Sequence, residues 1–257
     1  MPAPRKNRLT GLPAPYLKRL WVREDASLNG QYPFNLPWFD MDFSLDFTTP
    51  VTIVVGENGT GKSTLIEAVA ALCGFDEAGG GKGYRPVDHS RAVDRSGALL
   101  SSALRASWLP KVTSGWFFRA ESFFSVARFL DEAARDANAA PPDFLSWSHG
   151  EGFIRFFEER MSRQGMYLLD EPESALSPRR QLELLRLLVT IQSSANAQII
   201  MATHSPILMA VPGARLLEIN PAGLAETGLR ETRHFKLYRD FTEDPDDFVA
   251  RALRDEI

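Results

Sequence analysis

The segment Gly56-Glu57-Asn58-Gly59-Thr60-Gly61-Lys62-Ser63 has the residue types and spacing of a loop that holds phosphate. Its glycines allow successive backbone N–H groups to point at one centre, and a helix that starts here adds the positive end of its dipole. Lys62 could then reach the β and γ phosphates, and the Ser63 hydroxyl could ligate magnesium. We therefore predict ATP and Mg²⁺ as cofactors, bound by this loop together with Thr64; a chance glycine-rich turn is the alternative.

Two acids end a second apolar run, Met166-Tyr167-Leu168-Leu169-Asp170-Glu171. Charges at the end of a buried strand are costly unless they face a cation or water. A magnesium ion beside the phosphate loop would supply the cation. We predict that Asp170 holds the metal together with Ser63, and that Glu171 polarises the attacking water as general base. An ordinary strand end with two exposed acids is the alternative.

The order of these motifs resembles that of the ABC ATPases, and the resemblance covers Val51 to Pro206. Ser148-His149-Gly150-Glu151 stands where this family has its signature Ser-Gly-Gly-Gln at the start of a helix, with His149 replacing a glycine and Glu151 the glutamine. The resemblance implies that Ser148 and Gly150 complete the ATP site of a second subunit, so that ATP lies between two protomers. A helix N-terminus would suit a γ-phosphate, whereas a simple N-cap serine is the alternative.

Three further assignments rest on the same resemblance. His204, in Thr203-His204-Ser205, matches the switch histidine that senses the γ-phosphate, and we count it with Glu171 and Lys62 as catalytic. Ser174-Ala175-Leu176-Ser177 resembles the D-loop, with Ser177 where transporters usually have aspartate. Glu121, after Trp116-Phe117-Phe118-Arg119-Ala120, stands in place of the Q-loop glutamine, where a carboxylate could approach magnesium or its water.

Strands and helices of a particular order must position these residues. Val51 to Val55 is β-branched and, apart from Thr52, apolar, as expected for a central parallel strand covered on both faces. Lys62 to Leu72 has apolar residues at helical spacing. Further strands are predicted at 115–120, 166–169, 198–202 and 215–219, and further helices at 122–135, 151–163 and 178–191. This alternation predicts an α/β P-loop NTPase fold with a mainly parallel central sheet flanked by helices.

The flanking segments have different patterns. Residues 1–15 contain four prolines and several basic residues, which predicts a flexible lead-in to a single ATPase domain at 16–257. Tyr16 to Arg23 and Met41 to Phe47 alternate between apolar and polar residues, which predicts an N-terminal antiparallel β portion. Gly79-Gly80-Gly81 and Gly83 predict a flexible loop without regular structure, within a basic, Gly-rich insertion around 74–119. The acidic stretch 242–257 predicts a short surface helix.

Composition places few limits on partners. A chain of 257 residues with 44% hydrophobic content can form one globular α/β domain, and its net charge of -4 creates no global attraction to nucleic acid or anionic lipid. We find no secretory signal and no apolar run of the roughly 18 residues that spanning a membrane requires, so we expect a cytoplasmic protein without membrane insertion. The single cysteine, Cys73, lies in an apolar stretch and is expected to be buried.

Several details indicate which kind of ABC ATPase this is. Asp-Glu-Pro-Glu at 170–173, Thr-His-Ser-Pro at 203–206 and the Ser-His-Gly-Glu signature resemble the soluble branch that includes RecF-like and chromosome-maintenance ATPases, and a group of small bacterial AAA-family ATPases. The stretch Lys82 to Arg119 holds seven basic and two acidic residues. The leading hypothesis is a homodimer that closes around ATP and acts on a macromolecule, either DNA or a partner protein, in DNA repair or phage defence. The alternatives are the ATP-binding subunit of an ABC transporter and a small-molecule kinase.

Overall fold

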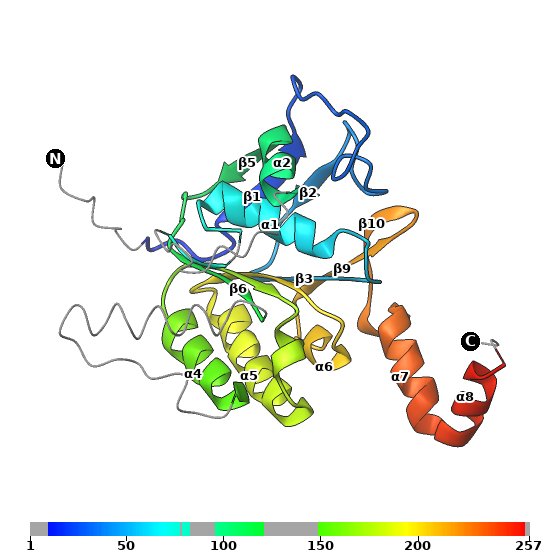
Figure 1. Ribbon diagram of the computed structural model, residues 1–257. Helices are drawn as coiled ribbons and strands as arrows, with labels where there is room; N and C mark the ends of the chain where they lie inside the picture. The colour runs from blue at the N-terminus through cyan, green and yellow to red at the C-terminus, as the bar shows by residue number, and fades with distance from the viewer. Residues whose placement is uncertain (1–9, 78, 83–95, 121–148, 255–257) are drawn as a thin grey trace.

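The computed structural model describes residues 10–77, 79–82, 96–120 and 149–254 (Figure 1). Within them, a seven-stranded sheet has the order β10-β9-β3-β8-β7-β6-β4. The strands from β9 to β6 are parallel, whereas β10 and β4 pair antiparallel at the two edges. The predicted mainly parallel sheet is thus confirmed. Its strands are β3 (Val51–Gly56), β4 (Gly80–Gly81), β6 (Gly115–Arg119), β7 (Met166–Asp170), β8 (Gln198–Ala202), β9 (Arg215–Asn220) and β10 (Gly223–Glu226).

A second, antiparallel sheet of three strands has the order β2-β1-β5. It contains β1 (Leu17–Val22), β2 (Ser44–Asp46) and β5 (Leu104–Trp108). This confirms the predicted antiparallel β portion, although β2 is shorter than the alternation from Met41 to Phe47 indicated. Its third strand, β5, was not predicted. β5 lies far from β1 along the chain, so the sequence around β1 gives no indication that the two strands pair.

Helices cover both faces of the large sheet (Figure 1). On one side lie α1 (Lys62–Cys73) and α2 (Ser96–Ala103), together with the antiparallel sheet. The other side carries α4 (His149–Met161), α5 (Pro178–Ser194) and α6 (Pro206–Met209). The 3₁₀ turns η1 (Pro172–Ala175) and η2 (Leu229–Glu231) precede α5 and α7, and α7 (Arg233–Glu243) and α8 (Pro245–Ala252) extend from the body at the C-terminal end. The helix predicted at 122–135 lies outside the described residues.

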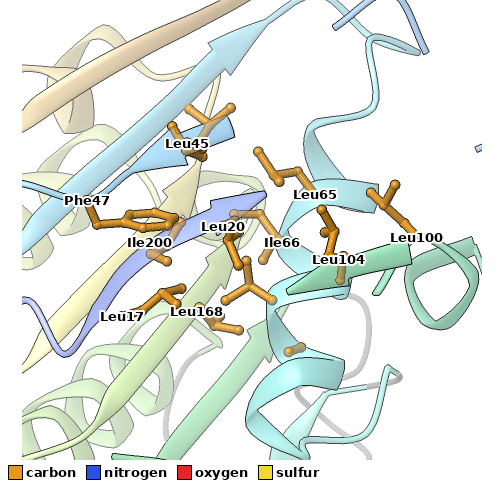
Figure 2. Close-up of a cluster of buried hydrophobic side chains, with 14 of the residues drawn as sticks. Leu17, Leu20, Leu45, Phe47, Leu65, Ile66, Leu100, Leu104, Leu168 and Ile200 are labelled. Carbon is orange, nitrogen blue, oxygen red and sulfur yellow. The ribbon is translucent and has the colours of Figure 1, made fainter. Parts of the chain in front are cut away.

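Two apolar cores hold these layers together, and β3 contributes to both. Val54 faces the core shared with α1 and the antiparallel sheet, whereas Ile53 and Val55 face the core under α4 and α5. Figure 2 shows the first core, where Leu20 of β1 and Leu65 of α1 meet side chains of the large sheet. Cys73 is buried in this core, as predicted, and burial raises the pKa of its thiol to about 12. No helix in the described part of the chain is long and apolar enough to cross a membrane.

Two glutamines tie the N-terminal segment to the large sheet. The Gln164 side chain accepts from Thr10 N at 2.7 Å, and its amide donates to Thr10 O at 2.9 Å. Gln198 Oε1 accepts from the backbone N–H groups of Tyr16 at 2.7 Å and Leu17 at 2.8 Å. The structure therefore packs residues 10–15 against the body, whereas residues 1–9 of the expected flexible lead-in lie outside the described residues.

The prediction that Gly79-Gly80-Gly81 forms no regular element was wrong. Gly80 and Gly81 form the edge strand β4, which pairs with Phe117 and Trp116 of β6. A Cβ at Gly81 would lie 2.8 Å from the Trp116 ring. The absence of a side chain therefore allows the backbone to approach the indole closely enough to pair.

Candidate functional site

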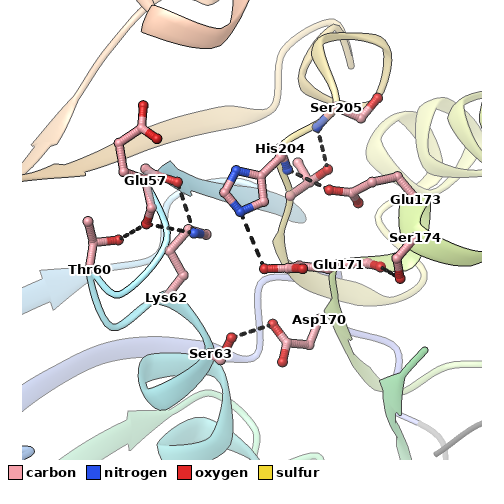
Figure 3. A network of polar contacts seen from close by, with 12 residues as sticks. Glu57, Thr60, Lys62, Ser63, Asp170, Glu171, Glu173, Ser174, His204 and Ser205 are labelled. Atoms are coloured by element: carbon pink, nitrogen blue, oxygen red, sulfur yellow. Dashed lines mark hydrogen bonds and ion pairs between the residues drawn. The ribbon is translucent and has the colours of Figure 1, made fainter. Parts of the chain in front are cut away.

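Three predicted motifs meet at one edge of the large sheet. In the sheet, β8 lies between β3 and β7, and all three are parallel. The phosphate loop follows β3, the acids end β7, and His204 follows β8, so all three lie at the carboxyl ends of neighbouring strands (Figure 3). This edge is where open α/β sheets place their ligands.

The phosphate loop curls around the side chain of its own lysine. Lys62 Nζ donates to the carbonyl oxygens of Gly56 at 2.8 Å and Glu57 at 3.0 Å. Burial lowers the pKa of Lys62, and the acids nearby oppose that shift. Gly56 has no room for a side chain, because a Cβ would lie 2.5 Å from the Ile219 carbonyl oxygen of β9. Gly61 has φ 90 and is the N-cap of α1, a left-handed conformation that favours glycine.

Side chains between β1 and β2 support this loop from outside, and the sequence did not reveal them. Trp38 Nε1 donates to the Thr60 carbonyl oxygen at 2.8 Å, and the Tyr32 hydroxyl hydrogen-bonds the Thr64 hydroxyl. Leu36 occupies the space beside Gly61, where a Cβ would lie 2.7 Å from the leucine side chain. Thr64, predicted as a cofactor-binding residue, therefore has its side chain engaged with Tyr32.

The two predicted metal ligands lie side by side. Ser63 Oγ donates to Asp170 Oδ1 at 3.0 Å (Figure 3). Both are hard oxygen donors, and a serine with one carboxylate leaves the other positions to phosphate and water, as Mg²⁺ prefers. The described residues contain no cluster of three or more His, Cys, Asp and Glu that could hold a metal. Burial raises the pKa of Asp170, which a cation would offset.

Arg119 is a functional candidate that the sequence analysis counted only within a basic stretch. At the end of β6, its Nη1 lies 2.7 Å from Glu67 Oε1 of α1, and its Nε lies 3.7 Å from Asp170 Oδ2. It lines a cavity of about 90 Å³ together with Ser63, Ala120, Asp170, Glu171 and Ser174. The sequence could not predict these contacts of Arg119, because β6, α1 and β7 are distant from one another along the chain.

Glu171 has an unusual backbone. Its φ of 47 and ψ of 54 are left-handed, a conformation uncommon outside glycine. Glu171 N donates to the Ala202 carbonyl oxygen at 3.0 Å, and Ser174 Oγ donates to the Glu171 carbonyl oxygen at 2.8 Å. These bonds direct the carboxylate toward His204, whose Nε2 lies 3.3 Å from Glu171 Oε1 (Figure 3).

His204 is held by two hydrogen bonds. Its backbone N–H donates to Glu173 Oε1 at 2.6 Å, and its Nδ1 lies 2.9 Å from Nε2 of His234 in α7. Its Nε2 is buried and not aligned as a full hydrogen bond to any described residue, despite the proximity of Glu171. Burial is the largest influence on His204 and lowers its pKa, so the ring is neutral near pH 7. If this nitrogen carries the ring proton, an oxygen of a phosphate would be a suitable acceptor for it.

The signature segment is described only in part. Glu121 and Ser148 lie outside the described residues, as does the side chain of His149. Helix α4 begins at His149, so the segment stands at a helix start, as the resemblance implied. Glu151 forms an ion pair with Arg180 of α5, with Oε1 and Nη2 2.6 Å apart. The guanidinium thus partly neutralises the acid that replaces the family's glutamine.

Comparisons with known proteins match both halves of this site. A family model described as "AAA domain" matches residues 35–98, which include the phosphate loop. Another, described as "AAA domain, putative AbiEii toxin, Type IV TA system", matches residues 152–210, which include Asp170 and His204. The molybdate import ATP-binding protein MolC of Haemophilus influenzae is 26% identical over 168 residues, a match covering 61% of this chain and 62% of that protein.

Solved structures include similar chains. The SMC head domain from Thermotoga maritima is 17% identical with a TM-score of 0.46, and the match covers 83% of this chain and 99% of that one. CbiO1 from Clostridium perfringens, part of the ABC transporter complex CbiONQ, is 18% identical with a TM-score of 0.44, over 91% of this chain and 98% of that one. The two AAA-domain models match the segments that meet at this sheet edge, and the similarity supports an ABC-type P-loop ATPase.

Proposed function

We propose that residues 16–257 form one ATPase domain that binds ATP with Mg²⁺ and hydrolyses it at the β3, β7 and β8 edge. The observation that carries the proposal is the 3.0 Å contact between Ser63 and Asp170, beside the 3.3 Å approach of His204 to Glu171. One pair offers oxygen ligands to a cation and the other a base and a proton donor. In this proposal, Gly56 to Thr64 form the nucleotide-binding loop.

The residues divide the work of phosphoryl transfer to water. Bound Mg²⁺ supplies positive charge at the phosphates. Lys62 exchanges its loop carbonyls for the β and γ phosphates, and Ser63 and Asp170 hold the metal. Glu171 orients the attacking water and accepts its proton, a role worth roughly 10²- to 10⁴-fold in rate. His204 offers its Nε2 proton to the terminal phosphate.

We further propose that two copies of the chain close around ATP. The Glu171 side chain is 40% exposed, so a single copy does not exclude water from the base. A second copy, presenting Ser148 and Gly150 at the start of α4, would cover it. This arrangement distinguishes the ATPase from a small-molecule kinase, which would need neither a dimer nor Ser148.

Sedimentation combined with ATP hydrolysis tests the site and the dimer. Wild type is expected to hydrolyse ATP slowly, and Glu171→Gln is expected to form an ATP- and Mg²⁺-dependent dimer with hydrolysis lowered at least about 100-fold. Ser148→Arg in the Glu171→Gln background should abolish the dimer, whereas Arg230→Glu, at an exposed position on η2, should leave it intact. A monomer under all conditions, with ATP bound, would refute the sandwich and favour the kinase.

The partner is proposed to be a macromolecule, DNA or a protein, in DNA repair or phage defence. The description of the 152–210 family model, which names a toxin of a toxin–antitoxin system, supports a defence role. For DNA, Arg105 and Lys111 support the proposal, because both are exposed on or beside β5. Arg119 does not belong to such a surface, since it is paired with Glu67 inside the site.

The ATP-binding subunit of a transporter is the second candidate, favoured by the similarity to MolC, a molybdate import ATP-binding protein. It predicts that the chain, expressed in its own host, co-purifies with an integral membrane protein and that ATPase activity rises when that protein is present. Recovery without a membrane protein, together with ATP-dependent binding to DNA or to a soluble protein, would instead favour the first candidate.

A further inference from the structure

The pair formed by His204 and His234 lies beside the base but belongs to none of the motifs. His234 is the second residue of α7, and its Nε2 lies 2.9 Å from His204 Nδ1. The two ring centroids are 5.0 Å apart, and both side chains are partly buried. A helix near the C-terminal end of the chain therefore reaches the side chain that faces Glu171.

The anchoring of α7 keeps this ring in place. Thr232, the N-cap, is fully buried; its hydroxyl accepts from Phe235 N at 3.2 Å and donates to the Leu229 carbonyl oxygen at 2.8 Å. Because His234 lies within the first turn after this cap, its position is set by the body of the protein rather than by the exposed remainder of α7.

The shared bond holds a single proton. Burial is the largest influence on both rings and lowers both pKa values, so both imidazoles are neutral near pH 7. Lys62 disfavours protonation of both rings, whereas Glu171 favours it for His204, and Glu57 and Glu218 favour it for His234. Between two neutral rings, one nitrogen must donate and the other must accept.

The surroundings decide which nitrogen donates. If His204 Nδ1 carried the proton, its Nε2 would direct a lone pair at the Glu171 carboxylate 3.3 Å away. That arrangement would also leave His234 Nδ1 as a buried donor, and no described residue accepts from it. If His234 Nε2 donates instead, His204 carries its proton on Nε2, facing Glu171. This second arrangement removes the lone pair directed at Glu171 and leaves His234 Nδ1 as an unpaired buried acceptor instead of an unpaired buried donor, which is the less costly of the two.

We infer that His234 is a positioning residue, which donates to His204 Nδ1 and thereby fixes His204 as the Nε2–H tautomer. The inference rests on the proposed function: only this tautomer presents a proton to both the base and a terminal phosphate. His234 itself touches neither.

Long-range ¹H–¹⁵N correlation of imidazole nitrogens tests the tautomer directly. The chain has four histidines, so substituting the other three one at a time assigns the signals of His204. The expected result in the wild type is protonated Nε2 and unprotonated Nδ1 on His204. The opposite tautomer in the wild type would overturn the inference, whether or not the protein hydrolyses ATP.

Kinetics of His234 variants give a second test. His234→Phe should lower kcat on the order of tenfold, the lower end of the effect seen for hydrogen-bond partners of metal-bound histidines, with little change in the KM for ATP. His234→Gln, which keeps an N–H donor, should recover most of the loss, and Tyr238→Phe, at an exposed position of α7, should match wild type. Equal activity of wild type and His234→Phe, or a His234→Gln variant no better than His234→Phe, would overturn the inference.

The two experiments separate failure of the inference from failure of the proposed function. A wild type that hydrolyses no ATP removes the proposed function, and the tautomer of His204 then decides the inference by itself. A wild type that hydrolyses ATP with the Nδ1–H tautomer keeps the proposed function and removes the role of His234.

Discussion

Ser63 and Asp170, the proposed metal ligands, lie in contact with each other without a metal. The two residues are 107 positions apart in sequence, and their oxygens are 3.0 Å apart. Asp170 is buried, and its carboxylate is partly balanced by Arg119 at 3.7 Å. A divalent cation between the oxygens would replace the hydroxyl hydrogen bond and offset the desolvation of the carboxylate.

This arrangement predicts that Ser63→Ala weakens nucleotide binding only when magnesium is present. The loop amides and Lys62 remain, so affinity for ATP in chelator should be nearly unchanged. With Mg²⁺, affinity should fall at least about tenfold, equivalent to about 1.4 kcal/mol. Titration with a fluorescent ATP analogue would measure both, and Ser63→Thr, which keeps the hydroxyl, is the control. Equal losses with and without Mg²⁺ would argue against Ser63 as a metal ligand.

Glu67 predicts a pH dependence of stability in the absence of nucleotide. Burial raises its pKa from 4.5 to about 7, although Arg119 opposes the shift. Because the folded protein binds this proton more tightly than the unfolded chain, the contribution is full below pH 4.5 and is lost as the pH rises to about 7. The free energy of unfolding of wild type relative to Glu67→Gln should therefore fall between about pH 5 and pH 8.

Denaturant unfolding at several pH values would measure this difference, with magnesium and nucleotide left out. Glu24→Gln, at an exposed position, serves as the control and should not reproduce the effect. A difference between wild type and Glu67→Gln that rises with pH would show that Arg119 outweighs burial at this carboxylate.

Among the elements, the pairing of β6 with β7 depends on one glycine. A Cβ at Gly115 would lie 1.8 Å from the Met166 carbonyl oxygen, and the residue has φ +135. Gly223 at the start of β10 has a similar φ of +130 but no atom within 4 Å of the same position. The two sites share backbone strain and differ in the collision with the neighbouring strand.

Gly115→Ala should therefore be more destabilising than Gly223→Ala, by more than about 2 kcal/mol. Thermal and denaturant unfolding of the two variants would measure the difference. Because β6 carries Arg119, the Gly115→Ala variant should also lose ATPase activity at temperatures where it is still folded. Similar stabilities of the two variants would mean that β6 and β7 can separate at Gly115 at little cost.

Local sequence patterns predicted the elements whose burial is uniform or strictly periodic. Val51–Val55 is buried throughout and apolar apart from Thr52 because both faces of β3 are covered, and α5 begins where Pro178 follows the N-cap Ser177. The spacing of apolar residues did not predict α7, because this helix has no buried side chain. It did not predict β4 either, because this strand consists of two glycines. Arg119 and His234 escaped prediction as site residues because their partners come from distant elements. The roles of Glu121 and Ser148 stay predictions.

For the molecule as a whole, charge predicts where duplex DNA would bind if DNA is the partner. Arg105→Glu with Lys111→Glu should weaken ATP-dependent retention of DNA about tenfold or more at low salt. The control is Arg230→Glu with Lys236→Glu, which changes the net charge by the same amount at exposed positions nearer the C-terminus. This pair should leave retention of DNA unchanged. Filter binding over a salt series would compare them. Equal effects of both pairs, or no retention by the wild type, would direct the search to protein partners.

The left-handed backbone of Glu171 implies a trade-off between the proposed catalytic role of this residue and the thermal stability of the protein. A non-glycine residue with φ 47 carries a conformational penalty of about 1–2 kcal/mol that glycine avoids. Glu171→Gly should thus raise the melting temperature while eliminating hydrolysis. Selection for stability alone would replace this glutamate, and the proposed role of Glu171 as general base accounts for a carboxylate at this position. The chain is less stable at this residue than its fold allows.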